Sequence, residues 1–304
     1  MSKYALAVDI GATKAALGIV TDEFQILEKV EVPTGAGTNI WQDIEGASRS
    51  LLSRADGDCL GVGIGSAGPL HLDEGQISPV NIPNWRNFPI VNKFSTLVGT
   101  ENVVLHGDAM ALAHAEYRLG AGQDTQNMFG MVVSTGIGGG LVLGGKLFTG
   151  VTGNASYFGH HSIAFEGKEC VCGRIGCVET YASGPKMVEY AQEIGWRHQN
   201  PDFKSLAQDA RDGNKFAIAS IDRGSKALAN AIVNVLDILD INTVVIGGGV
   251  SEAGEIYWEP LRRHIKTEAK FAGFLEEIDL RPAKLDRDAG LLGAALGVLD
   301  NERE

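Results

Sequence analysis

Apolar runs and short glycine turns alternate along the chain, and this pattern predicts a protein that mixes strands and helices. Residues 4–9 form an apolar run that ends in Asp9, and residues 15–20 form a second run of the same kind. Further apolar runs are short enough to be buried strands and are bounded by turn residues. These predicted strands are residues 60–65, 103–105, 131–133, 141–143 and 243–246.

Between the strands, apolar residues recur at the spacing of a helix. This spacing predicts helices over residues 41–54, 109–119 and 255–270, and over most of 184–240. The tail 288–299 is rich in alanine, glycine and leucine, so its small side chains allow a neighbour to approach closely. We therefore expect this last helix to pack against the N-terminal lobe.

Two segments share one plan of strand, glycine turn and strand. Aligning Gly11 with Gly136 gives an offset of 125 residues between them. A repeated unit at this separation predicts two related lobes on either side of a cleft, each contributing a glycine turn. We expect a small lobe over 1–115, completed by the helix at about 289–304, and a large lobe over 116–288. No Pro/Ser-rich linker separates them, so the boundary near 108–125 is predicted to be a hinge built from packed elements.

Composition supports this picture and excludes some partners. With 304 residues, of which 44% are hydrophobic, the chain can bury a substantial core in two lobes. A net charge of -12 without a lysine and arginine cluster disfavours nucleic acid. The first strand follows the N-terminus directly, without a leader, and no apolar run reaches membrane-spanning length. We expect a cytoplasmic protein with reduced cysteines and no membrane partner.

Three of the four cysteines lie within eight residues and form the clearest chemical signal of the sequence. Cys170, Cys172 and Cys177 follow the pair His160-His161, and one imidazole would complete the ligand set of a closed, tetrahedral zinc site. Glycines between the cysteines let the loop fold back on itself. The alternative is a chance grouping of thiols, but a cluster of three cannot be satisfied by internal disulfides. His160 is the favoured fourth ligand and His161 the alternative.

The two glycine turns are candidate phosphate sites, because backbone N–H groups without a crowding Cβ can point at a phosphate. Asp9 could hold Mg²⁺ through water, or it could simply cap the turn. Thr13 and Thr135 could donate to phosphate or close their turns, and Lys14 could reach a phosphate or remain an exposed lysine. No P-loop string occurs. The G-x-G-x-x-G match at Gly63–Gly68 is rejected, since strand and turn residues follow it where a dinucleotide fold requires a helix.

Taken in order, these motifs resemble the ROK family of sugar kinases and sugar-responsive repressors over nearly the whole chain. The motifs are Asp9-Ile-Gly-Ala-Thr-Lys14, Ser134-Thr-Gly-Ile-Gly-Gly-Gly140, Gly159-His160, and Cys170-x-Cys-Gly-x-x-Gly-Cys-Val-Glu179. The resemblance implies an actin-like ATPase fold, related to ribonuclease H, that binds ATP with Mg²⁺ and a hexose or N-acetylhexosamine between two lobes. Family repressors carry an N-terminal helix-turn-helix, for which the first strand at residue 4 leaves no room.

The resemblance also implies roles for individual residues. Asp108 corresponds to the base that accepts the proton of the sugar 6-hydroxyl group. Its position directly before Ala109 also fits the alternative role of a helix N-cap. Glu179 corresponds to a carboxylate that binds sugar hydroxyl groups, and His160 both ligates structural zinc and faces the sugar. The remaining implied contacts are Gly68, Asn81 and Tyr157 to the sugar, and Asp9, Gly11, Thr13, Lys14, Thr135, Gly136, Gly138, Gly247, Gly248 and Gly249 to Mg²⁺-ATP.

Two positions depart from the family pattern. Gly107 stands where the family usually has Asn, and Tyr157 stands where it usually has Glu, so two hydroxyl-recognising side chains are missing. His106 or His161 could compensate, or each could be an ordinary structural histidine. The sequence therefore predicts a sugar 6-kinase, with a non-catalytic sugar-binding sensor of the same fold as the alternative. The choice of sugar, of ATP or polyphosphate as donor, and of homodimer or homotetramer stays open.

Overall fold

The computed structural model describes residues 3–11, 13–35, 39–80, 82–270, 274–275 and 277–300. By contacts the chain divides into two compact units. Unit 1 comprises Met1–Gln123, Gly140–Ser156 and Leu285–Glu304, and unit 2 comprises Asp124–Gly139 and Tyr157–Lys284. The chain thus passes between the units four times. Asn81, which the sequence analysis assigns to sugar binding, lies outside the described residues.

The first sheet belongs to unit 1 and has the strand order β3-β2-β1-β4-β7. These strands are β1 (Lys3–Ile10), β2 (Lys14–Thr21), β3 (Ile26–Pro33), β4 (Asp58–Ser66) and β7 (Val103–Gly107). Strand β1 is antiparallel to β2 but parallel to β4, and β4 is parallel to β7. The carboxyl ends of β1, β4 and β7 therefore lie at the same edge of the sheet, which is where open α/β sheets bind ligands.

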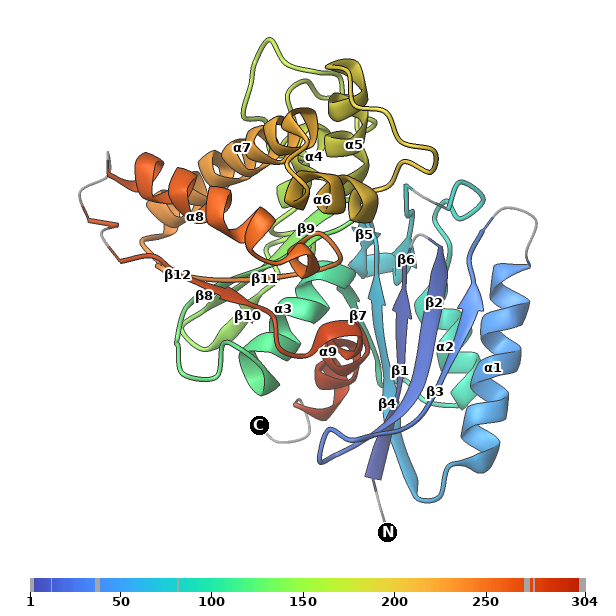
Figure 1. The fold of residues 1–304 in the computed structure, drawn as a ribbon. Coiled ribbons are helices and arrows are strands. Elements are labelled where there is room, and N and C mark those ends of the chain that lie inside the picture. The colour runs from blue at the N-terminus through green and yellow to red at the C-terminus, as the bar shows by residue number, and fades with distance from the viewer. Residues whose placement is uncertain are drawn as a thin grey trace. The chain divides into compact units, whose positions relative to one another are not determined.

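Helices cover both faces of this sheet (Figure 1). Helices α1 (Ile40–Arg54) and α2 (Ile90–Val98) pack on one side, α1 against β2 and β3 and α2 against β4 and β7. On the other side α9 (Ala289–Leu299) packs against β1 and β4, and α3 (Asp108–Leu119) packs against α9. Unit 1 also contains the short elements β5 (Leu70–His71), η1 (Leu72–Glu74), β6 (Gln76–Ile77), β10 (Lys146–Phe148) and η4 (Asp286–Asp288).

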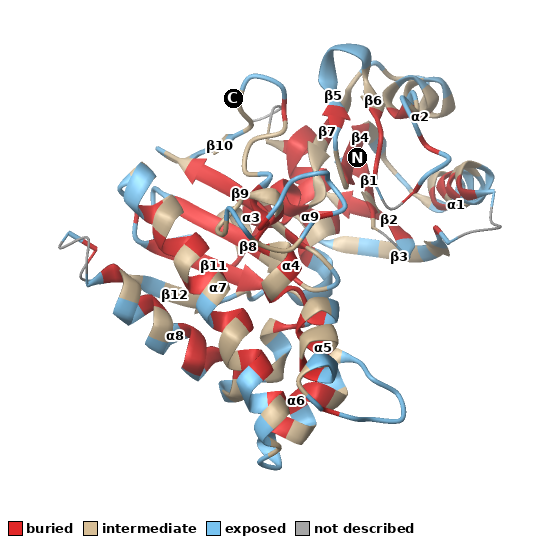
Figure 2. Ribbon diagram, turned by 90° about the horizontal axis from the view of Figure 1, so that it is seen from above, coloured by how far each residue is buried: buried red, intermediate tan, exposed pale blue. Residues whose placement is uncertain are grey.

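Helix α9 has no polar face. All of its residues except Gly290 are buried, and the helix sits deep in the unit (Figure 2). Glycines make this close packing possible, since a Cβ on Gly63 would overlap the Ala294 carbonyl group and one on Gly293 would overlap that of Ala111. The small residues of the tail thus fit the sequence-based expectation that a neighbour approaches this helix closely.

A buried carboxylate holds the end of α3. Glu116 is fully buried, and its two oxygens accept the backbone N–H groups of Ala121 and Leu285, each at 2.8 Å. Ala121 lies just before the chain first leaves unit 1, and Leu285 is the residue at which it last returns. Buried polar groups need such partners, so Glu116 fixes both segments to the same helix.

The second sheet repeats the plan of the first, with the order β10-β9-β8-β11-β12. Its further strands are β8 (Met128–Val133), β9 (Ile137–Leu143), β11 (Thr243–Gly247) and β12 (Asp279–Pro282). Strand β8 is parallel to β11, and β11 is parallel to β12. The predicted repeat is therefore present, because a glycine turn joins β1 to β2 and another joins β8 to β9.

The helices of unit 2 pack around α7 (Lys215–Leu239), which lies along α8 (Glu255–Ala269). Asn214 caps α7, because its side chain accepts the N–H groups of Phe216 and Ala217. Three shorter helices and two 3₁₀ turns complete the unit: α4 (Glu179–Ala182), α5 (Gly184–Glu193), α6 (Phe203–Arg211), η2 (Phe158–His160) and η3 (Ser251–Ala253). Figure 2 shows buried and exposed residues alternating along α7 and α8, as expected for amphipathic helices.

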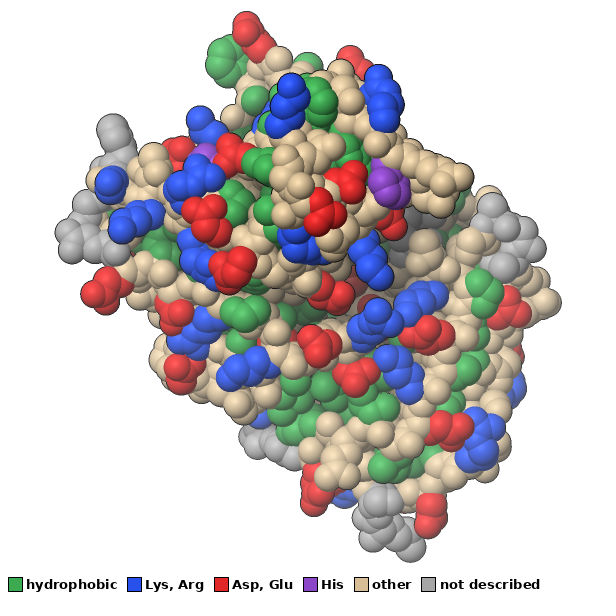
Figure 3. All heavy atoms as spheres, viewed as in Figure 1, with side chains coloured by type: hydrophobic (Ala, Val, Ile, Leu, Met, Phe, Trp, Pro, Cys, Tyr) green, Lys and Arg blue, Asp and Glu red, His purple; other side chains and the backbone are tan. Residues whose placement is uncertain are grey.

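The strands and helices predicted from the periodicity are all present, with ends that differ by at most four residues, and 184–240 divides into α5, α6 and α7. The pattern did not predict β3, α2, β10 or β12. Within the described ranges, none of the helices is both long and apolar enough to cross a lipid bilayer. Figure 3 shows acidic and basic side chains interspersed over one face of the molecule.

Candidate functional site

Two carboxylates lie at the carboxyl edge of the first sheet. Asp9 is near the end of β1 and pairs in register with Gly65 of β4, while Asp108 directly follows β7 and begins α3. A Cβ built on Gly65 would lie 3.6 Å from Asp9 Oδ1 and 3.8 Å from Asp108 Cα. Gly65 thus separates the two acids, and its missing side chain leaves room beside both.

Burial raises the proton affinity of both acids. Burial raises the pKa of Asp9 to about 7, and the charge of Asp108 adds to this, while Lys29 and Lys14 oppose it. Burial also raises the pKa of Asp108, against a hydrogen bond from the Ala109 N–H group to Asp108 Oδ1 at 2.7 Å. Such neighbouring carboxylates are typical of sites that hold a divalent cation and accept a proton.

Asp108 is the first residue of α3 and not its N-cap, which is Gly107. Its side chain bonds only to the adjacent N–H group and not to the second or third N–H of the helix, so it does not make the usual capping contact. The capping alternative considered for Asp108 is therefore wrong.

The first glycine turn follows Asp9. The Gly11 N–H group donates to the Lys14 carbonyl at 3.0 Å, and Thr34 bonds to the Gly11 and Thr13 carbonyls, also at 3.0 Å. Lys14 Nζ lies 2.6 Å from Glu31 Oε1, with both side chains about half exposed. An exposed pair contributes only about 0–1 kcal/mol, so it would not prevent Lys14 from turning to a phosphate. Gly68 lies just beyond β4, at the same edge of the sheet.

Two residues at this edge escaped the sequence analysis. A Cβ on Gly290 would overlap the Asp9 carboxylate, so glycine is needed there for Asp9 to keep its position. Gly65 lies next to both Asp9 and Asp108, where a Cβ would make ordinary van der Waals contacts with them. In the sequence, Gly65 is only a glycine at the end of a predicted strand and Gly290 is one of several glycines in the tail, and both features are too common to mark a site.

In unit 2, glycine turns follow the adjacent parallel strands β8 and β11. The turn after β8 contains Thr135, whose side chain is exposed, Gly136 and, at the start of β9, Gly138. The turn after β11 contains Gly248, which has a φ of +91° and on which a Cβ would overlap the Val133 carbonyl. Gly247 pairs in register with Val132, and a Cβ on Gly249 would lie 3.8 Å from Ser134 Oγ. The structure thus brings these predicted nucleotide residues together at one edge.

Glu179 connects the first of these turns to the cysteine loop. It begins α4, and its Oε2 accepts the Ile137 N–H group at 2.8 Å. A Cβ on Gly136 would lie 2.7 Å from the same oxygen, and one on Gly159 would lie 3.2 Å from it. Within the described part of the chain, Oε1 has no hydrogen-bond partner. One carboxylate oxygen is therefore fixed by the backbone, and the other remains available to a hydroxyl group.

Gly159→Ala tests this packing. The added methyl group would overlap the Ile137 carbonyl, which is backbone and cannot turn away, so we expect a loss of about 1–3 kcal/mol in stability. The control is Gly46→Ala in α1, where a Cβ meets nothing within 4 Å and where alanine favours the helix. Thermal melts should show a lower Tm for the first variant and an equal or higher Tm for the second. An unchanged Tm for Gly159→Ala would refute the close approach.

Four predicted metal ligands converge in unit 2. One ligand atom from each of His160, Cys170, Cys172 and Cys177 lies within 4.8 Å of all the others. Cys172 Sγ is 3.7 Å from Cys177 Sγ, and Cys170 Sγ is 3.4 Å from His160 Nδ1. A tetrahedral ion with Zn–S bonds of about 2.3 Å and Zn–N bonds of about 2.1 Å requires S–S distances of about 3.8 Å and S–N distances of about 3.6 Å. The donor set and the spacing therefore fit such an ion.

The structure places His160, and not His161, with the three sulfur atoms. The His160 ring lies 4.8 Å from the ring of Tyr157, which is 43% exposed and precedes it by one 3₁₀ turn. His161 instead lies near Phe158, and burial together with the charge of Arg174 lowers its pKa. Of the two candidate metal ligands, His160 is thus the one in position.

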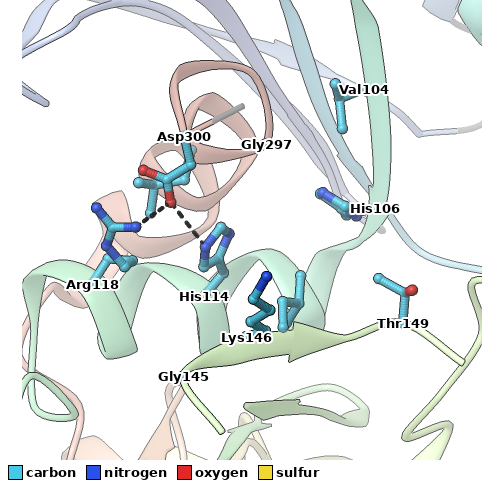
Figure 4. Close-up of a pocket in the computed structure, with 11 residues that line it drawn as sticks. Val104, His106, His114, Arg118, Gly145, Lys146, Thr149, Gly297 and Asp300 are labelled. Carbon is cyan, nitrogen blue, oxygen red and sulfur yellow. Dashed lines mark hydrogen bonds and ion pairs between the residues drawn. The ribbon is translucent and has the colours of Figure 1, made fainter. Parts of the chain in front are cut away.

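His106 is the other histidine that could compensate for the missing sugar-binding side chains. It lies on β7 and lines a pocket with His114 and Arg118 of α3 (Figure 4), which the sequence analysis did not identify. Burial, helped by the charge of His114, lowers the pKa of His106 from 6.5 to about 4. His106 is therefore neutral near pH 7, and its position favours the structural alternative over the sugar-binding one.

This shift predicts a pH dependence of stability. Because the folded state binds the His106 proton less tightly than the unfolded state, stability is lost as pH falls from 6.5 to about 4, by about 3 kcal/mol at most. In His106→Gln this dependence of the free energy of unfolding on pH should vanish. His71→Gln, at an exposed site, should keep it. Urea unfolding at pH 7 and pH 4.5 measures the difference. Equal slopes for His106→Gln and the parent chain would contradict the shift.

Comparison with known proteins adds independent information. The profile of the ROK family matches residues 5–301. The glucokinase of Thermotoga maritima is 33% identical over 305 residues, which cover 95% of each chain. The N-acetylmannosamine kinase of Salmonella typhi is 35% identical over 294 residues, covering 96% of this chain and 97% of the relative. A solved ROK family glucokinase from Streptomyces griseus, in complex with glucose and AMPPNP, has a TM-score of 0.81 at 32% identity and covers 96% of this chain and 98% of its own.

Proposed function

We propose that this chain, which belongs to the ROK family, uses ATP to phosphorylate a hexose or N-acetylhexosamine at its 6-hydroxyl group. Membership confirms the predicted family and its actin-like ATPase fold with two lobes. The relatives named glucokinase and N-acetylmannosamine kinase support a sugar kinase. The observation that carries the reaction is the placement of Asp9 and Asp108 on either side of Gly65.

Asp108 is the proposed catalytic base. It accepts the proton of the sugar hydroxyl group while the oxygen attacks the γ-phosphorus atom and the bond to ADP breaks. Burial raises its pKa, which strengthens it as a base. A positioned base contributes about 10²–10⁴-fold to the rate. Alignment of the two substrates supplies much of the rest.

Asp9 is the proposed group that holds Mg²⁺ through water, since this ion prefers carboxylate and water oxygens. Bound Mg²⁺ would neutralise charge on the phosphates. The turn of Gly11, Thr13 and Lys14 lies next to Asp9 and offers the Thr13 hydroxyl group and the Lys14 ammonium group to the same phosphates. In unit 2 we assign the nucleotide to the turns with Thr135, Gly136 and Gly138, and with Gly247, Gly248 and Gly249.

We further propose that His160, Cys170, Cys172 and Cys177 bind a structural Zn²⁺ ion. The four ligands would leave no open position, so the ion would brace the loop without taking part in the chemistry. Support for this role comes from Glu179 and Tyr157, which stand at the two ends of the loop. A braced loop would hold the free oxygen of Glu179 and the His160 ring toward the sugar.

Sugar recognition would then depend on Glu179, His160, Tyr157, Gly68 and Asn81, in addition to Asp108. Tyr157 offers one hydroxyl group where the family usually has a carboxylate, so it can make one directed bond to a sugar but carries no charge. Gly107 offers no side chain at all. We expect weaker discrimination among glucose, mannose and their N-acetylamino derivatives than a full set of recognition side chains would provide.

A substrate panel tests the proposal. Metal-loaded protein is assayed for ADP release with glucose, mannose, N-acetylglucosamine and N-acetylmannosamine, and with polyphosphate as the other donor. NMR of the product then locates the phosphate, which we expect on the 6-oxygen. If ATP binds normally and no sugar stimulates ADP release, the kinase assignment fails.

The second candidate is a sugar-binding sensor without activity, which the missing side chains at Gly107 and Tyr157 favour. Calorimetry separates the two functions. A sensor would bind sugar without turnover, and Asp108→Asn would change nothing in its response, whereas the kinase loses turnover in the same variant.

We also propose a cytoplasmic homodimer or homotetramer. Free thiols in the metal loop are compatible with a reducing compartment. Support comes from Phe165 and Val171 in the segment that carries the metal ligands, which are 88% and 81% exposed and would be covered if a second copy packed there. Light scattering coupled to gel filtration measures the assembly, and a monomer at micromolar concentration would contradict it.

A further inference from the structure

One residue just beyond β3 holds the turn that joins β1 to β2. Strand β3 ends at Pro33, which pairs in register with Lys14 at the start of β2. Thr34 follows directly and therefore lies beside the turn. It is only 3% exposed, although Pro33 and Gly35 on either side of it are exposed. The chain thus buries a single polar residue at the point where it passes the turn.

Thr34 makes two hydrogen bonds, and both go to carbonyl groups of the turn. Its hydroxyl group donates to the Gly11 carbonyl and its backbone N–H group donates to the Thr13 carbonyl, each at 3.0 Å. The Lys14 carbonyl accepts the Gly11 N–H group, also at 3.0 Å. The carbonyl groups of these three turn residues are therefore all paired inside the protein.

This pairing matters for a turn that receives a phosphate group. A carbonyl oxygen carries a partial negative charge, so a carbonyl that faced a phosphate would repel it. The bonds from Thr34 direct the oxygens of Gly11 and Thr13 toward Thr34 itself. The side chains of Thr13 and Lys14 are exposed, and their hydroxyl and ammonium groups can donate to a phosphate. The turn thus combines donors that are accessible with acceptors that are occupied.

The hydroxyl group of Thr34 is the part of this arrangement that a substitution can remove. Without it, the partly buried Gly11 carbonyl would lose its donor, and such an unpaired acceptor is unfavourable. The turn would then have to shift to find another partner. Gly11 lies two residues after Asp9, so a shift would affect the start of the phosphate turn and the proposed Mg²⁺ group together.

We propose that Thr34 is a positioning residue for the phosphate groups of the nucleotide. It acts through the Gly11 and Thr13 carbonyl groups, which it holds away from the phosphates, and does not touch the nucleotide itself. This role rests on the proposed function, in which the turn of Gly11, Thr13 and Lys14 is a phosphate site. Thr34 lies 23 residues after Gly11 and belongs to none of the glycine motifs.

Calorimetry with AMPPNP and Mg²⁺ tests the proposal on the full-length protein. Thr34→Val keeps the shape of the side chain but has no hydroxyl group, so AMPPNP should bind at least about 5-fold more weakly. Thr34→Ser keeps the hydroxyl group and should stay within about 3-fold of the parent chain. With a sugar that the substrate panel identifies, Thr34→Val should raise the KM for ATP and leave the KM for the sugar unchanged.

Ser48→Ala is the matched control. Ser48 is also buried in unit 1, and its hydroxyl group donates to the Ile44 carbonyl at 2.8 Å. The variant loses the same kind of bond, but inside α1 instead of at the turn, so AMPPNP should bind normally even if the Tm falls. A purely structural role of Thr34 would lower the Tm of Thr34→Val in the same way and leave its affinity for AMPPNP unchanged.

Two results would overturn the proposal: equal affinity for AMPPNP in Thr34→Val and the parent chain, or an equal loss of affinity in Thr34→Val and Thr34→Ser. If Thr34→Val does not fold, Thr34→Ala removes the same hydroxyl group and takes its place in the comparison. The assay requires no turnover, so a chain that fails the substrate panel still tests Thr34. A parent chain that binds no AMPPNP would refute the nucleotide assignment itself, and the role of Thr34 with it.

Discussion

Asp108→Asn is expected to lower kcat by about 10²–10⁴-fold and to leave the fold intact. The amide has the shape of the carboxylate but cannot take up the proton of the attacking hydroxyl group. Burial raises the pKa of Asp108, so the ionised form is disfavoured in the folded state and stability falls as pH rises past the unfolded value of 3.8. Removing this charge should keep or raise the Tm at pH 8. Steady-state kinetics and thermal melts on the same preparation measure both effects.

The matched control for this variant is Asp43→Asn, at an exposed carboxylate of α1, which should retain full turnover and an unchanged Tm. Nucleotide affinity should also persist in Asp108→Asn, because the variant keeps Asp9 and both glycine turns. A fall of Tm in parallel with kcat would show that Asp108 acts in folding. Full turnover in Asp108→Asn would exclude it as the base.

Cys172→Ser is expected to remove the metal, stability and activity together. Cys172 is exposed, so the substitution itself adds little strain, yet it removes one of four ligands. Structural zinc contributes about 10–16 kcal/mol in small zinc domains. Even part of this would appear as a fall in Tm of at least several degrees. Elemental analysis of the purified chain should find about one zinc ion in the parent and much less in the variant.

Cys59→Ser provides the control, because Cys59 lies on β4 with its thiol directed to the Gly61 carbonyl and takes no part in the cluster. It should retain the metal and the activity. Treatment with a chelator should reproduce the effect of Cys172→Ser in the parent chain and have no further effect in the variant. Normal metal content in Cys172→Ser would refute the proposed ligand set.

The residues that could be predicted from the sequence lie where a local pattern and a chemical requirement coincide. Asp9 and Asp108 end apolar runs, so their place at the edge of a sheet followed from the strands alone. Cys170, Cys172 and Cys177 are close in sequence, and no fold is needed to bring them together. Strand β3 was missed because it is an edge strand whose charged and exposed residues hide the alternation of apolar ones.

Other contacts could not be predicted, because they join distant segments. Glu179 bonds to the backbone of Ile137 across 42 residues, and Gly290 makes room for Asp9 from the other end of the chain. The residues that line the pocket around His106 range from Val104 to Asp300, and none of them belongs to a motif. The burial that lowers the pKa of His106 likewise requires the elements around β7, among them α9 and α3, to be in place. Such properties arise only when the whole unit has formed.

The position of α9 has a consequence for synthesis on the ribosome. The strands β1 and β4 that it covers emerge first, whereas α9 emerges last, roughly 280 residues after β1. At about 5–20 residues per second, the nascent chain spends about 15–60 s with an uncovered apolar sheet face. The N-terminal half therefore cannot complete its core during translation. A product that stops before residue 289 would expose that face permanently and become a substrate for chaperones and proteases.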